Sequence, residues 1–290
     1  MSLDDHFPDL AGWEPTRDTL TLYAKVPGAI PRALAEPHPR WWHISLRVHP
    51  DGLITTRIPI PGETGESFTL LLNLRVHKLV IATRKSEVRE IGLAEGLPAS
   101  AFGEQVLAAL NELGIYAEVD RSGFEDPAPR EYERTMAEKY FLALEGVDRV
   151  FKKFRSEIGG ETSPVQFWTH HFDLSFEWYG EKMVSYEEHG ETKEGPSQIG
   201  FGFAPGDSSH AAPYFYANPW PFDETLTAET LPPGARWFVE SWKGSLLPYA
   251  ALALPQVSNQ REGDAGKDRP GDRLLAYLRA VYDLSAPTFS

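Results

Sequence analysis

Alternating apolar and polar positions predict strands in the N-terminal third of the chain. In RWWHISLRV, residues 40–48, every second position from Trp42 to Val48 is apolar. A strand sends successive side chains to opposite faces, so this pattern predicts a half-buried strand with His43 on its more polar face. The following HPDG predicts a turn and LITTRIPI, 53–60, a partner strand. The proline-rich first 40 residues predict irregular structure with one short helix, PTRDTLTLYAKV, 15–26.

The pattern then predicts a further long strand before it changes to a helical period. ESFTLLLNLRVHKLVIAT, 66–83, alternates in the manner of one strand, which places Asn73, Arg75 and His77 on its polar face. Apolar residues three and four positions apart predict helices over 98–114 and 131–158, and Gly114 suits a helix end. IYAEVD, 115–120, between the two helices is compatible with a short strand.

Strand patterns return in the last third of the chain. They cover PVQFWTHHFDLSFEWY (164–179), SQIGFGFAP (197–205) and APYFYANPWP (212–221), while ARWFVESW (235–242) fits strand or helix. RLLAYLRAVYDL (273–284) predicts a short terminal helix, preceded by a polar loop over 259–272 that we expect to be mobile.

The order of elements favours an α+β fold: antiparallel sheet blocks at both ends of the chain around a central helical segment, with a short C-terminal helix. We expect a single domain over 1–290. Its sub-blocks are 1–98, mainly β; 99–160, helical; and 161–290, mainly β with the terminal helix.

Composition excludes several classes of function. The formal net charge of −14 disfavours nucleic acid and anionic membrane surfaces as partners. The chain has no cysteine, which excludes thiolate catalysis and thiolate-bound metal. No apolar run approaches the roughly 18 residues that a membrane span needs. These features, with an acidic N-terminus, lead us to expect a cytoplasmic protein.

The segment SPVQFWTHHFDLSFEWYG, 163–180, carries the clearest candidate chemistry. If it is one regular strand, His170 lies in an apolar row, while His171 and Asp173 share the other face about 6.6 Å apart. That spacing suits two metal ligands or an imidazole–carboxylate pair for acid–base chemistry. An ordinary solvated strand face is the alternative, and a third metal ligand would have to come from elsewhere, such as His43 or His77.

Other motifs point to no known cofactor. IGFGFAPGD, 199–207, fits neither the dinucleotide-binding glycine pattern nor the P-loop, and the chain has no G-x-S-x-G nucleophile elbow. The cofactor, if there is one, is unknown. Tyr216, in an aromatic group at 213–221, suits either packing or a pocket wall.

Several of these stretches together resemble a bacterial family catalogued as domain of unknown function 5996. They are HPRWWH, GLITTRIPIPG, SPVQFWTHHFDLSFEWYG, IGFGFAPGD and PYFYANPWP, in that order, and the resemblance runs from about Trp13 to the terminal helix. In this resemblance, positions of the family pattern correspond to His38, Trp41, Trp42 and His43, to His77, and to the triplet Phe172, Asp173 and Leu174. His170 and His171 depart from the family pattern, so the resemblance favours His43, His77 and Asp173 as the shared site. It implies no activity.

Two functional hypotheses follow. The first is an enzyme or a small-molecule-binding protein with a pocket between the sheet blocks. In it, His43, His77 and Asp173, with His171 as a further candidate, supply acid–base or metal-binding groups, and Trp42, Trp168 and Tyr216 supply the walls. The second is a non-catalytic interaction protein, such as a homodimer, that uses an exposed aromatic surface. Substrate, reaction type and metal identity stay open in both.

Overall fold

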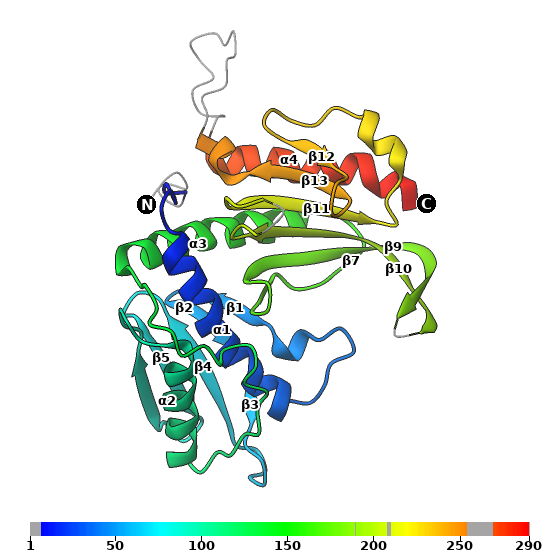
Figure 1. The fold of residues 1–290 in the computed structure, drawn as a ribbon. Coiled ribbons are helices and arrows are strands. Elements are labelled where there is room, and N and C mark those ends of the chain that lie inside the picture. The colour runs from blue at the N-terminus through cyan, green and yellow to red at the C-terminus, as the bar shows by residue number, and fades with distance from the viewer. Residues whose placement is uncertain (1–6, 189, 208–209, 254–268, 290) are drawn as a thin grey trace. The chain divides into compact units, whose positions relative to one another are not determined.

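The computed structural model describes residues 7–188, 190–207, 210–253 and 269–289 (Figure 1). The chain forms two compact units. Unit 1 comprises residues 1–7, 146–165 and 174–290, and unit 2 comprises residues 8–145 and 166–173. Each unit has its own set of antiparallel strands, and one helix contributes residues to both units, so each unit is described by itself.

The strands of unit 2 are antiparallel, in the order β8-β1-β2-β4-β5-β6, and β3 pairs with the first two residues of β4. The strands are β1 (Leu46–His49), β2 (Gly52–Thr55), β3 (Ile58–Pro59), β4 (Ser67–Asn73), β5 (Lys78–Thr83), β6 (Val88–Gly92) and β8 (Gln166–Trp168). The predicted turn at HPDG is confirmed, because His49 pairs with Gly52 across it.

Helices cover one face of this sheet: α1 (Glu14–Leu34) packs against α2 (Ala99–Glu112) and against β2, β3 and β4. In Figure 1 both helices lie on the same side of the strands. The strand residues that face them are fully buried, as alternate positions of β4 and β5 show: Leu70, Leu72, Leu79 and Ile81. The helix α2 confirms the prediction for 98–114, and α3 (Arg134–Glu157) confirms the one for 131–158.

The helix predicted over 15–26 is confirmed but was predicted too short, because α1 is a 21-residue helix that continues through Pro27 and Pro31. Proline removes one backbone N–H and usually ends a helix. Here burial of a long apolar face, which includes Leu20, Tyr23 and Ile30, holds the helix together across both prolines.

Two predicted strands in unit 2 are also wrong in extent. The segment 40–48 is a strand only from Leu46, because Trp42–Ile44 form a 3₁₀ turn, η2. The segment 66–83 is a hairpin, in which β4 ends at Asn73 and β5 starts at Lys78. His77 lies in the turn between them with a left-handed φ of 55° and does not share a strand face with Asn73. Residues 115–120 form no strand.

The strands of unit 1 are also antiparallel, in the order β12-β13-β11-β10-β9, and β7 pairs with β9. The strands are β7 (Glu161–Thr162), β9 (Asp173–Glu188), β10 (Glu191–Ala204), β11 (Tyr214–Trp220), β12 (Arg236–Phe238) and β13 (Gly244–Pro248). Its helices are the end of α3, α4 (Pro270–Ser285) and the 3₁₀ helices η3 (Glu224–Ala228), η4 (Tyr249–Ala253) and η5 (Ala286–Phe289).

The core of unit 1 is aromatic. The ring of Phe154 on α3 lies 5.2 Å from that of Phe201 on β10 and 6.1 Å from that of Tyr282 on α4. The strands predicted over 197–205 and 212–221 and the terminal helix are confirmed, and 236–238 is strand. Most of the predicted loop 259–272 lies outside the described residues.

The fold class predicted from sequence is therefore confirmed: α+β, with antiparallel sheet blocks, central helices and a terminal helix. None of the helices in the described part of the chain is both long and apolar enough to span a membrane. The expectation of a single domain stays a prediction.

The strand predicted over 164–179 is interrupted, and this break shapes the candidate site. β8 ends at Trp168 and β9 begins at Asp173, so residues 169–172 form a turn. The turn lies directly against α1: a Cβ on Gly28 would come within 2.1 Å of Thr169 Oγ1. Only glycine at position 28 permits this approach.

We expect Gly28→Ala to destabilise the protein by about 1–3 kcal/mol, because the added methyl group overlaps Thr169. Alanine is otherwise the better helix former by about 1 kcal/mol, so a loss of stability in this variant would come from the overlap with Thr169. Urea unfolding measures the change. Gly92→Ala is the control, because a Cβ there meets nothing within 4 Å; equal stability of the two variants would contradict the close approach.

Candidate functional site

The turn at 169–172 holds two histidines side by side. Phe172 has a left-handed backbone, with φ 57°, and its buried ring packs 5.0 Å from Phe167 and 5.4 Å from Tyr140. This burial fixes the turn while His170 and His171 stay exposed, with ring centroids 4.4 Å apart. The alternation predicted for a regular strand was wrong here: the two imidazoles lie together, and His171 and Asp173 share no strand face.

A second histidine pair lies in the segment between α1 and β1. The rings of this segment interleave: His38 stacks on Trp42 at 4.5 Å, and Trp41 stacks on His43 at 5.7 Å. The backbone N–H of His38 donates a hydrogen bond of 3.1 Å to His43 Nδ1. Trp41 also has a left-handed backbone, with φ 58°, although its side chain is 54% exposed.

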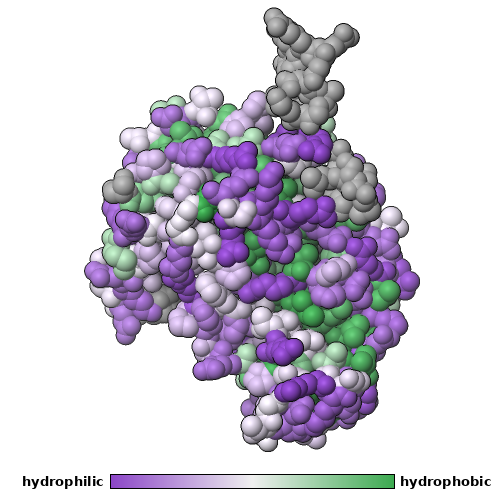
Figure 2. Space-filling model, turned by 180° about the vertical axis from the view of Figure 1, so that it is seen from behind, coloured by the Kyte–Doolittle hydropathy of each residue, from purple (hydrophilic) through white to green (hydrophobic). Residues whose placement is uncertain are grey.

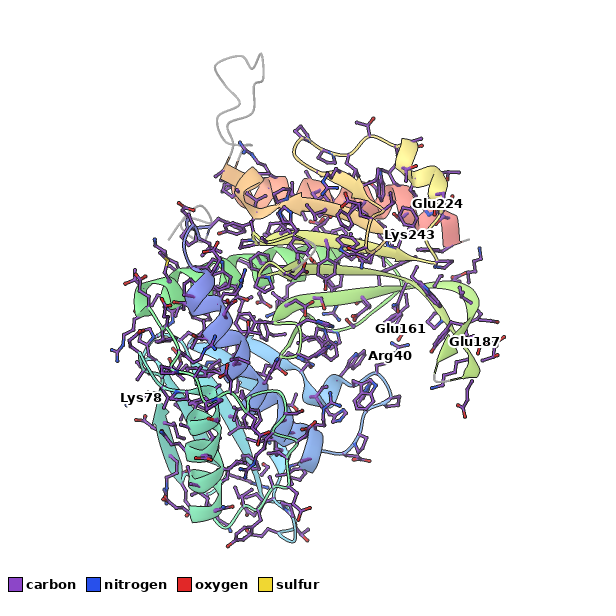
Figure 3. All side chains as sticks on the ribbon, viewed as in Figure 1. Arg40, Lys78, Glu161, Glu187, Glu224 and Lys243 are labelled. Atoms are coloured by element: carbon purple, nitrogen blue, oxygen red, sulfur yellow. The ribbon has the colours of Figure 1, made fainter. Side chains whose placement is uncertain are left out.

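Arg32, at the end of α1, connects the two histidine pairs. Its guanidinium lies 5.2 Å from the ring of Trp41, and its charge acts on His43 and on His170. Arg40, in the segment after α1 (Figure 3), lies over Trp42 at 5.7 Å. We call the whole group the basic aromatic cluster, which consists of Lys25, Arg32, His38, Arg40, Trp41, Trp42, His43, Trp168, His170 and His171.

The cluster keeps two of its imidazoles neutral. Partial burial, and then the charge of Arg32 and the proximity of His38, lower the pKa of His43 below its ordinary value. Shielding by neighbouring atoms lowers the pKa of His170 to about 4, with further contributions from His171, Arg32 and Lys25. Burial and positive neighbours both disfavour the charged form of an imidazole, so both groups are uncharged at neutral pH.

Hydrogen bonds also fix the tautomers of the first pair. Nδ1 of His43 accepts from His38 N–H, and Nδ1 of His38 accepts from the backbone N–H of Arg40 at 3.1 Å. A neutral imidazole that accepts at one nitrogen carries its proton on the other. His43 and His38 therefore each present Nε2–H as a hydrogen-bond donor.

His77 belongs to a different polar group. It is buried, Nδ1 lies 2.8 Å from the hydroxyl of Tyr132, and Nε2 lies 3.1 Å from Glu138 Oε1. The carboxylate of Glu138 accepts, so Nε2–H donates to it, and Nδ1 of the neutral ring then accepts from the hydroxyl of Tyr132. Both nitrogens are used within the fold.

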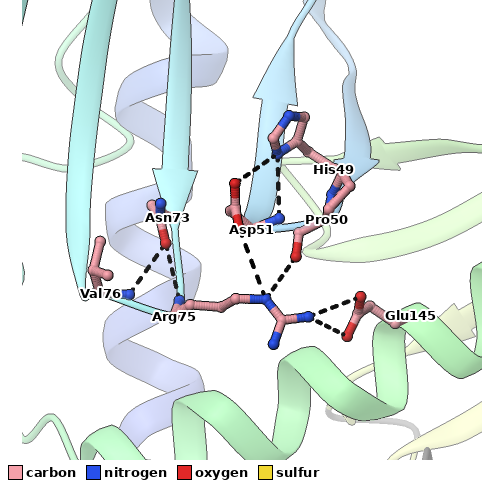
Figure 4. A network of polar contacts seen from close by, with 7 residues as sticks. All are labelled: His49, Pro50, Asp51, Asn73, Arg75, Val76 and Glu145. Atoms are coloured by element: carbon pink, nitrogen blue, oxygen red, sulfur yellow. Dashed lines mark hydrogen bonds and ion pairs between the residues drawn. The ribbon is translucent and has the colours of Figure 1, made fainter. Parts of the chain in front are cut away.

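A neighbouring network fixes the same hairpin turn (Figure 4). Arg75 Nε donates to the carbonyl of Pro50 at 2.6 Å, and Arg75 Nη2 donates to both carboxylate oxygens of Glu145 on α3. Asn73 Oδ1 accepts from the backbone N–H of Arg75 and of Val76. These contacts tie the β1–β2 and β4–β5 turns to α3, so this network is structural.

Asp173 and Tyr216 have surroundings of their own. Asp173 is buried at the start of β9. The pKa of Tyr140 is raised mainly by the burial of Tyr140 and further by the charge of Asp173. Tyr216 lies in unit 1, where it packs with Trp242 against an apolar cluster of Ala204, Tyr214, Phe238 and Leu246. The other two predicted pocket residues, Trp42 and Trp168, both belong to the basic aromatic cluster.

Two further features of the described residues bear on the site. No group of three or more histidine, aspartate or glutamate side chains is arranged to hold a metal ion within the described part of the chain. A hollow of about 670 Å³ is lined by residues 57 and 59–67, which lie from just before β3 to the start of β4 and include none of the candidate residues.

Sequence reasoning missed the central role of Arg32 and the pairing of His170 with His171. A local charge signal was present: residues 22–45 contain Lys25, Arg32 and Arg40 against the single acid Glu36, in a chain of net charge −14. The histidine pairing had no such signal, because it depends on the left-handed backbone of Phe172.

The chain belongs to a family of unknown function (DUF5996), whose model matches residues 7–289. No curated protein and no solved structure matches the chain.

We expect Arg32→Gln to raise the pKa of both His43 and His170, because it removes a positive charge that acts on each imidazole. Histidine titration by NMR measures both values in one experiment. Arg84→Gln, in the turn between β5 and β6, is the control. An increase at only one of the two histidines would disprove that Arg32 connects the pairs.

We expect Tyr132→Phe to lower the free energy of unfolding by about 1–3 kcal/mol, because it leaves Nδ1 of buried His77 without its donor. Chemical denaturation checks this value. Tyr116→Phe is the matched control, since that side chain is 72% exposed. No difference between the two variants would mean that the Tyr132–His77 contact contributes nothing to stability.

Proposed function

We propose that unit 2 binds a small organic anion that carries a planar ring, and that the basic aromatic cluster is its binding site. One observation carries the proposal: basic, imidazole and indole side chains from three separate segments gather around Arg32. A surface of an acidic protein has no structural need for such a gathering, because like charges repel one another.

The charges of the site favour an anion. Arg32, Arg40 and Lys25 supply positive charge, and the neutral imidazoles supply Nε2–H donors. Hydrogen bonds to a charged group contribute about 1.5–3 kcal/mol each, more than those between neutral groups. A long polyanion would be repelled by the chain as a whole, whose net charge is −14, which favours a small ligand over nucleic acid.

The rings of the site favour a planar ligand. Trp41 holds a strained backbone and exposes more than half of its side chain. Such strain costs about 1–3 kcal/mol and is found preferentially at functional sites. An indole that stacks on His43 with one face and reaches solvent elsewhere is suited to stack on a ring of a ligand.

The tautomers favour binding over general-base catalysis at His43. A general base needs an unprotonated nitrogen that can reach the substrate. Nδ1 of His43 already accepts from His38 N–H, and Nε2 carries the proton. We therefore assign His43 a binding role.

Matched probe pairs test the proposal: adenosine monophosphate against adenosine, and benzoate against benzyl alcohol. We expect the two anions to shift the NMR resonances of His43 and His170 and the two neutral analogues to leave them unchanged. Arg32→Gln should weaken anion binding at least tenfold, by the loss of one charged contact.

Trp41→Gly separates binding from folding, because glycine adopts the left-handed backbone at no cost while the indole is lost. We expect this variant to keep its stability and to lose binding. Ser86→Gly is the control, since Ser86 also has a left-handed backbone, with φ 67°, in a distant turn. Equal binding of charged and neutral probes, or full binding by Trp41→Gly, would overturn the proposal.

A further inference from the structure

The sheet of unit 2 has a second face that α1 and α2 do not cover. Its side chains alternate with the buried ones, and Ile54, Leu71, Val80 and Ala82 are only half-buried, while Val88 is 48% exposed. Figure 2 views the molecule from behind and shows apolar side chains gathered where this face is turned to the viewer. We call these five residues and the charged residues in line with them the open face.

Strand register places one row of the open face in a definite order. Arg47 on β1 pairs with Ile54 on β2, which pairs with Leu71 on β4. Leu71 pairs with Val80 on β5, and Val80 pairs with Glu90 on β6. Paired residues point to the same face. The row therefore reads basic, apolar, apolar, apolar, acidic across five strands.

Arg47 lacks a counter-ion in the described part of the chain. Its Nη1 donates to Ser45 Oγ at 2.7 Å and to the carbonyl of Leu46 at 3.2 Å, both of them neutral acceptors. The guanidinium is partly withdrawn from water, and burial lowers its pKa. Arginine nevertheless stays charged in proteins, and a partly buried charge is costly unless a carboxylate or another anion pairs with it.

We propose that a second copy of the chain packs its own open face against this one to form a homodimer. A two-fold axis that runs parallel to the strands through Leu71 reverses the row. It sets Arg47 opposite the partner subunit's Glu90, Ile54 opposite the partner subunit's Val80, and Leu71 opposite itself. A row with opposite charges at its ends and apolar residues between them is self-complementary, as an isologous interface requires.

The existing contact of Glu90 is compatible with this arrangement. Lys78, at the start of β5 (Figure 3), donates to Oε2 of Glu90 at 2.5 Å. A carboxylate has a second oxygen, so Glu90 can accept from Lys78 of the same chain and from Arg47 of the partner subunit. The proposal is independent of ligand binding, because no residue of the row belongs to the basic aromatic cluster.

Sedimentation velocity of the full chain over a range of concentrations tests the dimer. We expect a monomer–dimer equilibrium that Leu71→Glu shifts to monomer, because it places a carboxylate at the two-fold axis. Val76→Glu is the control, since Val76 is 54% exposed in the β4–β5 turn, outside the row. A monomer at every concentration, or a dimer that Leu71→Glu leaves intact while circular dichroism shows it folded, would overturn the proposal.

Charge exchange provides the second test, in case Leu71→Glu does not fold. Glu90→Arg should weaken the dimer at least tenfold, and the double variant Arg47→Glu with Glu90→Arg should recover most of that loss. A neutral effect of Glu90→Arg, or the absence of recovery in a folded double variant, would show that the copies do not pair in this register.

Discussion

The candidate site depends on the contact between α1 and the turn after β8. Gly28 lets the helix approach Thr169 so closely that no other residue fits, and this approach places the following two histidines beside the cationic end of α1. Because α1 continues through Pro27 and Pro31, it reaches Arg32, whose charge acts on both His43 and His170.

Backbone strain marks the same regions. Trp41, His77 and Phe172 each adopt a left-handed backbone, which costs a side-chain-bearing residue roughly 1–2 kcal/mol. Two of these costs are offset within the fold: Phe172 buries its ring among other aromatics, and His77 forms hydrogen bonds with both nitrogens. Trp41 has a stacked imidazole and a nearby guanidinium, but more than half of its side chain stays in water. It is therefore the position where strain most needs a function to explain it.

Hydrophobic periodicity predicted the elements that continue without interruption, such as α2, α3, α4, β10 and β11. It failed where a single residue reverses the chain direction inside an otherwise regular pattern. The segments 40–48, 66–83 and 164–179 all alternate correctly, and each is broken at or beside a left-handed residue. Alternation depends only on side-chain polarity, whereas a left-handed backbone at Trp41, His77 or Phe172 is imposed by tertiary contacts that come from distant residues, such as Tyr140 and Tyr132.

The break at Phe172 also changes the kind of chemistry that the histidines can support. A continuous strand would have aligned His171 with Asp173, and a carboxylate beside an imidazole raises its basicity. The turn removes that alignment and sets His171 beside His170, while Lys25 and Arg32 add positive charge at His170. A positive environment keeps an imidazole neutral and leaves it as a hydrogen-bond donor and acceptor of low basicity. His171, which suggests acid–base chemistry with Asp173 in the sequence, therefore lies in the fold beside His170 instead, in a cluster whose positive charges favour recognition of an anion.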